Sequence, residues 1–554
     1  MQLSSKQMTQ FKSRMSGLKS EYTTFESHHR ELAEYTLPRI GRWLVSDTNK
    51  GGKKNGKIID NTAKMALGVL SSGMMSSLTS PARPWFNLAH PDPDMQERQS
   101  VKVWNKIVMQ RMNAVFARSN VYQSLPRVYS ELGLFGQGPM GLFEDDDDTI
   151  FTQGYTQGEY WIANDKKGIV NTFGREYRLT VAQMVERYGY KNVSEKVRSL
   201  YDRGTYEAWV DLYHIVEPNT GRDFEKSDSI NKPFRDVVFE TSSSSHVNSF
   251  KGFEEFPIFC PRWDVNSGDV YASSSPGMDA LGDTKQLQLH EKRGSEAVEK
   301  MVRPSMVADP SMRNKHKSQL PGGVTYSSFV NGKPGFQEAY RVDMRINELE
   351  AKSKQIRERI NSAFFADLFL MLSNSDRRQI TATEIDKKYE EKLLMLGPVL
   401  ERLNRELLDP MINRTFNIMW RKGQIPPPPP ELQGVDMKIE YVSVLHQAQR
   451  SVGASSVDRL MGFAANVINI NPNSRHKINF DQTLDDYSSM LGTNPSLIRS
   501  DEEAQKLVEA EQAAMQQQQR AEMGMNAAKT AKDLSQTQGG DGTALETIIN
   551  SIQQ

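Results

Sequence analysis

One short stretch of the chain comes close to a phosphate-binding loop. Between Gly51 and Lys57 the order is one glycine, four further residues and then Gly-Lys, which is how the loop that wraps backbone amides around a nucleotide phosphate begins. That loop needs a serine or threonine next, because the hydroxyl ligates magnesium, and this chain has Ile58 there. No convincing buried strand precedes the loop. We therefore interpret the stretch as a flexible cationic surface loop and predict no cofactor.

The other candidate ligand residues also lack the required spacing. The run Glu144–Asp148 could hold a hard cation, but a calcium loop spaces its oxygen ligands around a glycine turn and this run is contiguous. His28 and His29 are neighbours on a predicted helix, so they face different directions. No Gly-x-Ser-x-Gly elbow and no His-Glu-x-x-His motif occurs. We predict no metal site and no catalytic residues, so the chain is not expected to be an enzyme.

Composition narrows the class of protein further. Of the 554 residues, 69 are Lys or Arg and 69 are Asp or Glu, so the formal net charge is 0 and a wholly basic nucleic-acid coat is excluded, although local basic patches are not. Cys260 is the single cysteine, which excludes an intramolecular disulfide and a cysteine zinc site and suits a reducing cytoplasm. No run approaches the roughly 18 apolar residues of a membrane span, and we expect no export signal and no lipid anchor.

The N-terminal part of the chain has the spacing of long helices. Residues 1–37 carry apolar residues at helical intervals, and Pro38 ends that pattern. Asp60 or Asn61 is placed to cap a second helix. Two further helices are predicted over 95–119 and 121–135.

Short strands and then long helices follow. From about 139 to 270 short runs typical of strands are interrupted by a helix near 180–202, which predicts an α+β region. A long helix over 279–303 is followed by a Pro- and Gly-rich insertion over 304–338. A second long helix is predicted over 343–370, with its apolar residues close to one face.

The last part of the chain contains a third long helix and a connector. A polar break, 373–379, leads into a helix that reaches about residue 421. Gly397-Pro398 lies inside this helix and predicts a kink, because proline removes a helical hydrogen bond. The run Pro426–Pro430 is a stiff connector. From Asp501 the composition favours marginal helix or disorder.

Four sequence blocks resemble the head-to-tail connecting proteins, or portal proteins, of short-tailed podovirus-type bacteriophages, and they occur in the family's order. The blocks are Ser71–Phe86, Tyr122–Pro126 with Leu134–Met140, Pro261–Trp263 with Val270–Lys285, and Thr381–Ile385 with Leu396–Leu403. Together they cover most of residues 1–450. The chain departs from the family at Ala272, because a glycine usually follows the tyrosine in that block.

The resemblance implies an α+β, predominantly helical portal-type subunit with a wing, a helical stem, a small α/β clip and a helical crown. The implied parts are the wing (1–278), the first stem helix (279–303), the clip (304–342), the second stem helix (343–370), the tunnel loop (371–382), the kinked wing helix (383–425), the crown (426–500) and a low-complexity tail (501–554).

The resemblance also implies a function and a set of partners. Subunits of this family form a homo-oligomeric ring, typically a dodecamer, at one capsid vertex. Double-stranded DNA is packaged through the ring by the terminase and later ejected, and the tail attaches to it. The implied partners are the terminase large subunit, a tail adaptor, the major capsid and scaffolding proteins, and DNA bound without sequence specificity; no membrane is involved. The subunit would be made in the host cytoplasm and end at the head–tail junction of the virion.

A channel that lets DNA slide needs unselective contacts between cations and phosphates. The candidate residues that the resemblance places near DNA are Arg377 and Arg378 in the loop, and Lys285, Lys292, Arg293, Lys300, Lys352, Lys354 and Arg357 on the stem. The stem set has an alternative interpretation. Its cations are interleaved with glutamates such as Glu296 and Glu358, which is also typical of solvated helix faces or of ion pairs between subunits.

Two other functions stay open at this point. The chain could be a nucleotide-dependent component of the packaging motor, with Lys57 in a degenerate phosphate loop. It could also be another structural virion component such as a tail adaptor, although adaptors tend to be much shorter than 554 residues. An ATPase assay distinguishes the first of these from a ring subunit.

Overall fold

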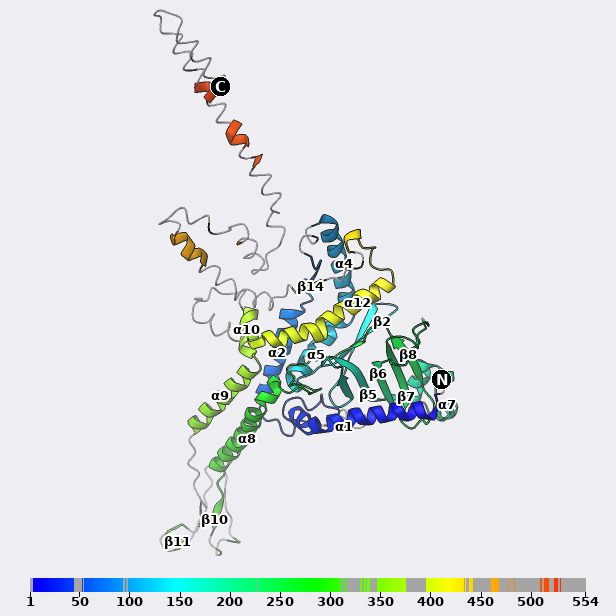
Figure 1. Ribbon diagram of the computed structural model, residues 1–554. Coiled ribbons are helices and arrows are strands. Elements are labelled where there is room, and N and C mark those ends of the chain that lie inside the picture. The colour runs from blue at the N-terminus through cyan, green and yellow to red at the C-terminus, as the bar shows by residue number, and fades with distance from the viewer. Residues whose placement is uncertain are drawn as a thin grey trace, which may run out of the picture. The chain divides into compact units, whose positions relative to one another are not determined.

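The computed structural model describes residues 3–43, 54–92, 98–226, 228–308, 346–374 and 395–432, together with shorter pieces such as 438–441 and 460–467. The chain divides into two compact units, Met1–Val452 and Gly453–Gln554. The first contains the helices and sheets of Figure 1 that are discussed below. In the second, 460–467 is helical. Arg377, Arg378, most of the expected tunnel loop and clip, and most of the tail lie outside the described residues.

Helix α1 (Ser5–Tyr35) begins at a capping box, in which Ser4 and Gln7 satisfy each other's backbone amides. Its apolar residues recur every three or four positions and form one buried stripe: Met8, Phe11, Met15, Leu18 and Tyr22. This stripe packs against a sheet, and the fit is close at Gly174, where an added Cβ would lie 2.7 Å from the Met15 sulfur. The helix predicted over 1–37 is therefore confirmed, with its end at Tyr35.

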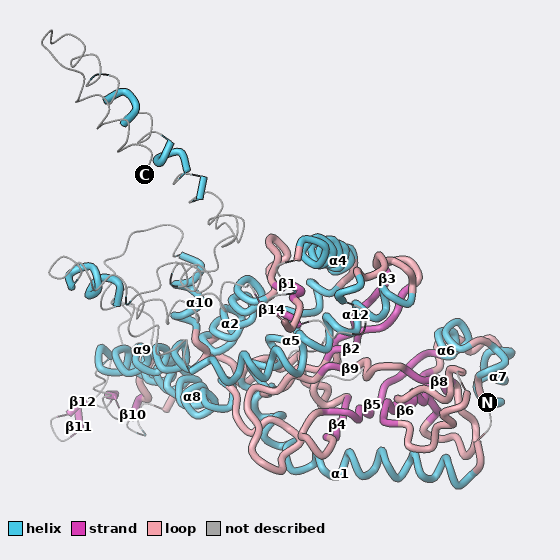
Figure 2. Tube along the Cα trace, turned by 45° about the horizontal axis from the view of Figure 1, so that its top comes forward, coloured by secondary structure: helices cyan, strands magenta, loops and turns pink. Residues whose placement is uncertain are grey.

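The sheet beneath α1 has five antiparallel strands in the order β4-β5-β6-β7-β8. Figure 2 shows these strands gathered at one end of the body, with α1 running along them. Helices α6 (Val181–Tyr188) and α7 (Glu195–Asp202) interrupt the strands in sequence and pack on the sheet through a separate small core. The strand bounds are Tyr160–Asn164, Val170–Thr180, Trp209–Pro218, Phe234–Glu240 and Ser249–Phe253.

A second, smaller sheet joins this region to the helices. Strand β2 (Met140–Asp145) lies between β3 (Thr149–Gly154) and β9 (Ile258–Phe259). The α+β region predicted between 139 and 270 is thus present, with the predicted helix near 180–202 divided into α6 and α7.

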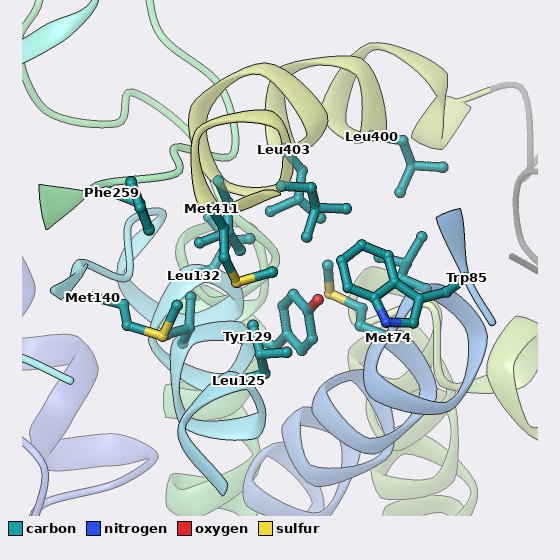
Figure 3. Close-up of a cluster of buried hydrophobic side chains, with 14 of the residues drawn as sticks. Met74, Trp85, Leu125, Tyr129, Leu132, Met140, Phe259, Leu400, Leu403 and Met411 are labelled. Carbon is teal, nitrogen blue, oxygen red and sulfur yellow. The ribbon is translucent and has the colours of Figure 1, made fainter. Parts of the chain in front are cut away.

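The main core lies among α2 (Thr62–Leu78), α4 (Gln99–Arg118), α5 (Val121–Phe135) and α12 (Asp409–Arg421). Figure 3 shows the side chains of Trp85, Tyr129 and Met411 meeting in this core. The buried Tyr129 hydroxyl lies 3.0 Å from the Thr79 hydroxyl, so its polar atom has a partner. Strand β1 (Phe86–Ala89) pairs with β14 (Lys438–Tyr441), which brings the chain after the proline run back to this core.

Two long helices form the stem-like pair that the sequence predicts. Helix α8 (Pro276–Val302) begins at Ser275, whose hydroxyl accepts a hydrogen bond from the Met278 amide. It packs beside α9 (Ile346–Ala363), and the fit is close at Gly294, where an added Cβ would lie 2.8 Å from the Leu349 side chain. Figure 1 shows the two helices side by side, with β10 (Met306–Ala308) beyond the end of α8. Strand β10 pairs with β13 (Phe336–Glu338).

One expectation about helix continuity needs correction, and a second stays a prediction. The helix predicted over 343–370 is not continuous: α9 ends at Ala363, and α10 (Ala366–Asn374) begins after Phe365, whose φ of 54° lies in the left-handed region. At this break the centre of the Phe365 ring lies 6.1 Å from the centre of the Trp263 ring. In the third long helix the observed irregularity is a π-helical turn at Asn404–Leu408. Residues 375–394 lie outside the description, so a kink at Pro398 stays a prediction.

Candidate nucleic-acid interface

Lys285 is the stem cation nearest the N-terminal end of α8, and it forms an ion pair. Its ammonium lies 2.6 Å from a Glu31 carboxylate oxygen on α1 and 5.9 Å from the centre of the Tyr35 ring. The hydrogen bond to Glu31 and the charge of that carboxylate raise the pKa of Lys285. Much of the Lys285 charge is therefore compensated within the subunit.

Arg357 on α9 is also paired, and it joins three segments. Its guanidinium donates to the Asp60 carboxylate at 3.0 Å and to Glu291 on α8 at 2.8 Å. Gln288 on α8 completes the junction, because its side-chain oxygen accepts from the amides of Ile59 and Asp60. Arg357 thus ties both stem helices to the start of α2, and Asp60 additionally caps that helix by accepting from the Thr62 amide at 2.7 Å.

The other five stem cations are exposed, and none of them forms an ion pair with a described residue. They are Lys292, Arg293 and Lys300 on α8, and Lys352 and Lys354 on α9.

Helix geometry sorts these side chains into faces. At about 100° per residue, Lys285, Lys292, Arg293 and Lys300 fall within a sector of about 100° on α8. Glu296 and the nearby Glu299 lie in or beside that sector and are also exposed, so the face has an excess of positive charge but is not uniformly positive. Lys352 and Lys354 are about 160° apart around α9, so they cannot both face the same axis.

A groove of about 660 Å³ lies between α8 and α9. Its walls include Val298 and Val302, which are 43% and 74% exposed, and Ser353 on α9. An exposed apolar lining of this kind is typical of a surface that packs against another chain.

The geometry around Lys57 differs from that of a phosphate loop. The ammonium of Lys57 forms an ion pair with Glu34 and lies 5.5 Å from the centre of the Tyr35 ring. Helix α1, not a strand, is the regular element that precedes this loop in the described part of the chain. Lys57 therefore belongs to the same group of charges around Tyr35 as Lys285.

The acidic run forms part of a turn, and burial shifts the pKa values of two other titratable residues. Asp145 begins the turn between β2 and β3, and its carboxylate accepts from the amides of Asp147 and Asp148. Burial raises the pKa of the Cys260 thiol to about 12 and lowers the pKa of His29 to about 3. No group of His, Cys, Asp or Glu that could hold a metal ion occurs within the described ranges. In the same part of the chain, no helix is long and apolar enough to cross a bilayer.

Sequence reasoning missed the partners that neutralise two of the candidates. Glu31 and Asp60 are 254 and 297 residues away from Lys285 and Arg357, so local spacing carries no sign of these pairs. The capping position of Asp60 was the one available signal. Arg377 and Arg378 follow the last described residue of α10 and stay outside the description.

Comparisons with known proteins agree over nearly the whole chain. Residues 8–498 match the family model described as bacteriophage head to tail connecting protein. The portal protein of Salmonella phage epsilon15 is 47% identical over 535 residues, covering 96% of each chain. The probable portal protein of Bordetella phage BPP-1 is 42% identical over 543 residues, covering 98% of this chain and 96% of the relative. A chain from the neck of an empty gene transfer agent particle matches 72% of this chain and 85% of its own length at 11% identity, but its TM-score of 0.31 is too low to support an argument.

Proposed function

Because this chain belongs to the family of bacteriophage head to tail connecting proteins, we propose that it closes into a ring, typically of twelve subunits, through which the terminase packages DNA and the DNA later leaves. The protein is a portal subunit in function, and its place is the head–tail junction of a phage particle. The observation that carries this is the family match over residues 8–498 together with 47% identity to a portal protein.

The pair of helices α8 and α9 supports a role as the stem around the channel. The exposed cations of α8 lie on one face, and such a face attracts phosphates without reading sequence. We propose Lys292, Arg293 and Lys300 as the stem cations that meet DNA. Lys285 and Arg357 carry charge that is already paired, so their contribution to the field at the DNA is smaller.

Exposed apolar residues on the stem support ring assembly. Leu289, Met301 and Val302 on α8 are 44%, 44% and 74% exposed, and Val298 opens into the groove. A head-to-tail contact that closes on itself gives cyclic symmetry and would cover such residues in every subunit. We expect negative-stain images of the purified chain to show rings with a central hole. A monodisperse monomer across salt and protein concentrations would contradict the proposal.

The proposed ring subunit is structural, with the terminase large subunit, the tail adaptor, and the capsid and scaffolding proteins as its partners. The motor alternative is less well supported, because Lys57 pairs with Glu34 rather than facing an open phosphate site. We expect no ATP hydrolysis by the purified chain above background. Turnover that Lys57→Ala abolishes and Lys64→Ala leaves intact would favour the motor instead.

A further inference from the structure

Helix α4 presents an exposed face that carries none of the residues proposed above for the channel or for the ring contact. The helix is anchored by a buried stripe that includes Trp104, Val108, Met112 and Phe116. Trp104 also donates from its indole nitrogen to the Pro426 carbonyl at 3.0 Å. The opposite face is therefore held rigidly in one orientation.

The composition of that exposed face is unusual. It contains four cations, four apolar residues, one serine and one glutamine, and no residue of α4 is acidic: Ser100, Lys102, Val103, Lys106, Ile107, Gln110, Arg111, Ala114, Ala117 and Arg118. Val103 and Ile107 are 45% and 37% exposed. Balanced surface helices mix charges of both signs, so an acid-free face of this length indicates a partner of opposite charge.

The positions of these residues form three parallel stripes. At about 100° per residue, Val103, Ile107 and Ala114 fall within about 40° of one another. Lys102 and Lys106 border this apolar stripe on one side, and Arg111 and Arg118 border it on the other. The arrangement is an apolar centre with cationic edges.

The described acids pair with one cation at the C-terminal end of the face and leave the two cations at its middle without a carboxylate partner. Arg118 lies 3.4 Å from Asp148, whereas Lys106 and Arg111 have no carboxylate partner among the described residues. Arg111 donates to the Gln424 carbonyl, which fixes its side chain without removing its charge. The Trp104 ring contacts that of Phe416 on α12, which in turn stacks on the ring of Trp420. Because Trp420 is 46% exposed, the apolar surface continues from α4 onto α12.

We propose that this face of α4 docks an amphipathic helix with acidic edges, contributed by a different protein. An apolar stripe flanked by cations is the complement of a helix whose own apolar stripe is flanked by Asp or Glu, as in helix-on-helix recognition. Nucleic acid fits less well, because phosphates gain nothing from Val103 and Ile107 at the centre of the face. A membrane fits less well too, since the exposed apolar side chains are few and small and α4 is fixed to the core by its other side.

The test uses the full-length chain and labelled synthetic helices of about 20 residues, the length of α4. The first peptide has a leucine stripe with glutamate edges, the second has lysine edges, and the third has glutamate edges with serine in place of leucine. We expect only the first to bind in the micromolar range. Ile107→Ser should weaken it about threefold or more, and Lys106→Glu with Arg111→Glu at least tenfold, since both edges would then repel it.

Matched controls keep this test specific. Met65→Ser changes an apolar residue on α2 that is 70% exposed, compared with 37% for Ile107. Lys191→Glu with Lys196→Glu makes the same change in net charge away from α4. Neither control should alter binding. If the first and third peptides bind equally, the proposal is overturned in favour of an anionic polymer. The same conclusion follows if the unchanged chain binds a short DNA duplex and only the α4 charge variant loses that binding. Loss of rings in the α4 variants would overturn it in favour of a second copy of this chain. Peptide binding that the α4 variants leave unchanged would also refute it.

Discussion

Replacing Arg262 with methionine is expected to destabilise the chain far more than the same change at its neighbour Arg402. Arg262 is 3% exposed, and its guanidinium lies 2.5 Å from one oxygen of Glu406 and 3.3 Å from the other. It also donates to the carbonyls of Gly168 and Val270 at 2.6 and 3.1 Å. One side chain therefore joins the β4–β5 turn, the segment before α8 and the π-helical turn at Asn404–Leu408.

The magnitude follows from burial. Removing one partner of a buried ion pair leaves the other charge uncompensated and costs about 3–5 kcal/mol. Glu406 keeps one hydrogen bond, from the Arg262 backbone amide at 2.9 Å, so the lower half of that range is expected. Arg402 pairs with Asp264 at 2.9 Å, but that carboxylate is 56% exposed, so Arg402→Met should cost about 1 kcal/mol or less.

Urea unfolding followed by tryptophan fluorescence measures both effects, and Trp263 reports directly because it is adjacent and buried. With a urea dependence of about 3 kcal/mol/M, the Arg262→Met midpoint should fall by about 1 M and that of Arg402→Met by much less. The double variant Arg262→Met with Glu406→Leu should recover most of the loss, because no unpaired charge remains. Equal midpoints for the two arginine variants, or no recovery in the double variant, would refute the reasoning.

Three further predictions concern the channel, a strained joint and a buried acid. Arg377→Glu with Arg378→Glu should leave ring yield by microscopy unchanged and lower the DNA packaged per particle, because like charges would face the phosphates; normal packaging would contradict the proposed contact. Phe365→Gly should have a higher melting temperature than Phe365→Ala, although both variants lose the ring, because a non-glycine residue at a φ of 54° costs about 1 kcal/mol. A lower melting temperature for Phe365→Gly would rule out the left-handed backbone conformation at this position. Burial raises the pKa of Glu131 to about 8, so the folded chain holds a proton that the unfolded chain releases above its ordinary pKa of 4.5. The stability from this proton is full below about pH 4.5 and is lost as pH rises through about 8, and Glu131→Gln should flatten that part of a plot of urea midpoint against pH, whereas an unchanged slope would argue against the assignment.

Local pattern was sufficient for much of the fold. The buried stripe of α1 was readable as a 3.6-residue period, because helix geometry alone brings those residues to one side. The predicted start of the first stem helix, at 279, was three residues late, although Ser275 and Pro276 carry a local signal for the observed start of α8, a capping hydroxyl and a proline that needs no amide partner. The four sequence blocks predicted the family that the comparisons then identified.

Only the tertiary structure decided how the candidate interface is charged and where its helices break. Lys285 and Arg357 look like any exposed stem cation in the sequence, yet each pairs with an acid more than 250 residues away. Phe365 reads as one more apolar residue in a helical period, but its contact with Trp263 coincides with a break in the helix. Helical and strand periods report the direction in which a side chain points. They carry no information about which distant segment the side chain contacts. Those contacts determine which cations stay unpaired and where the backbone is strained.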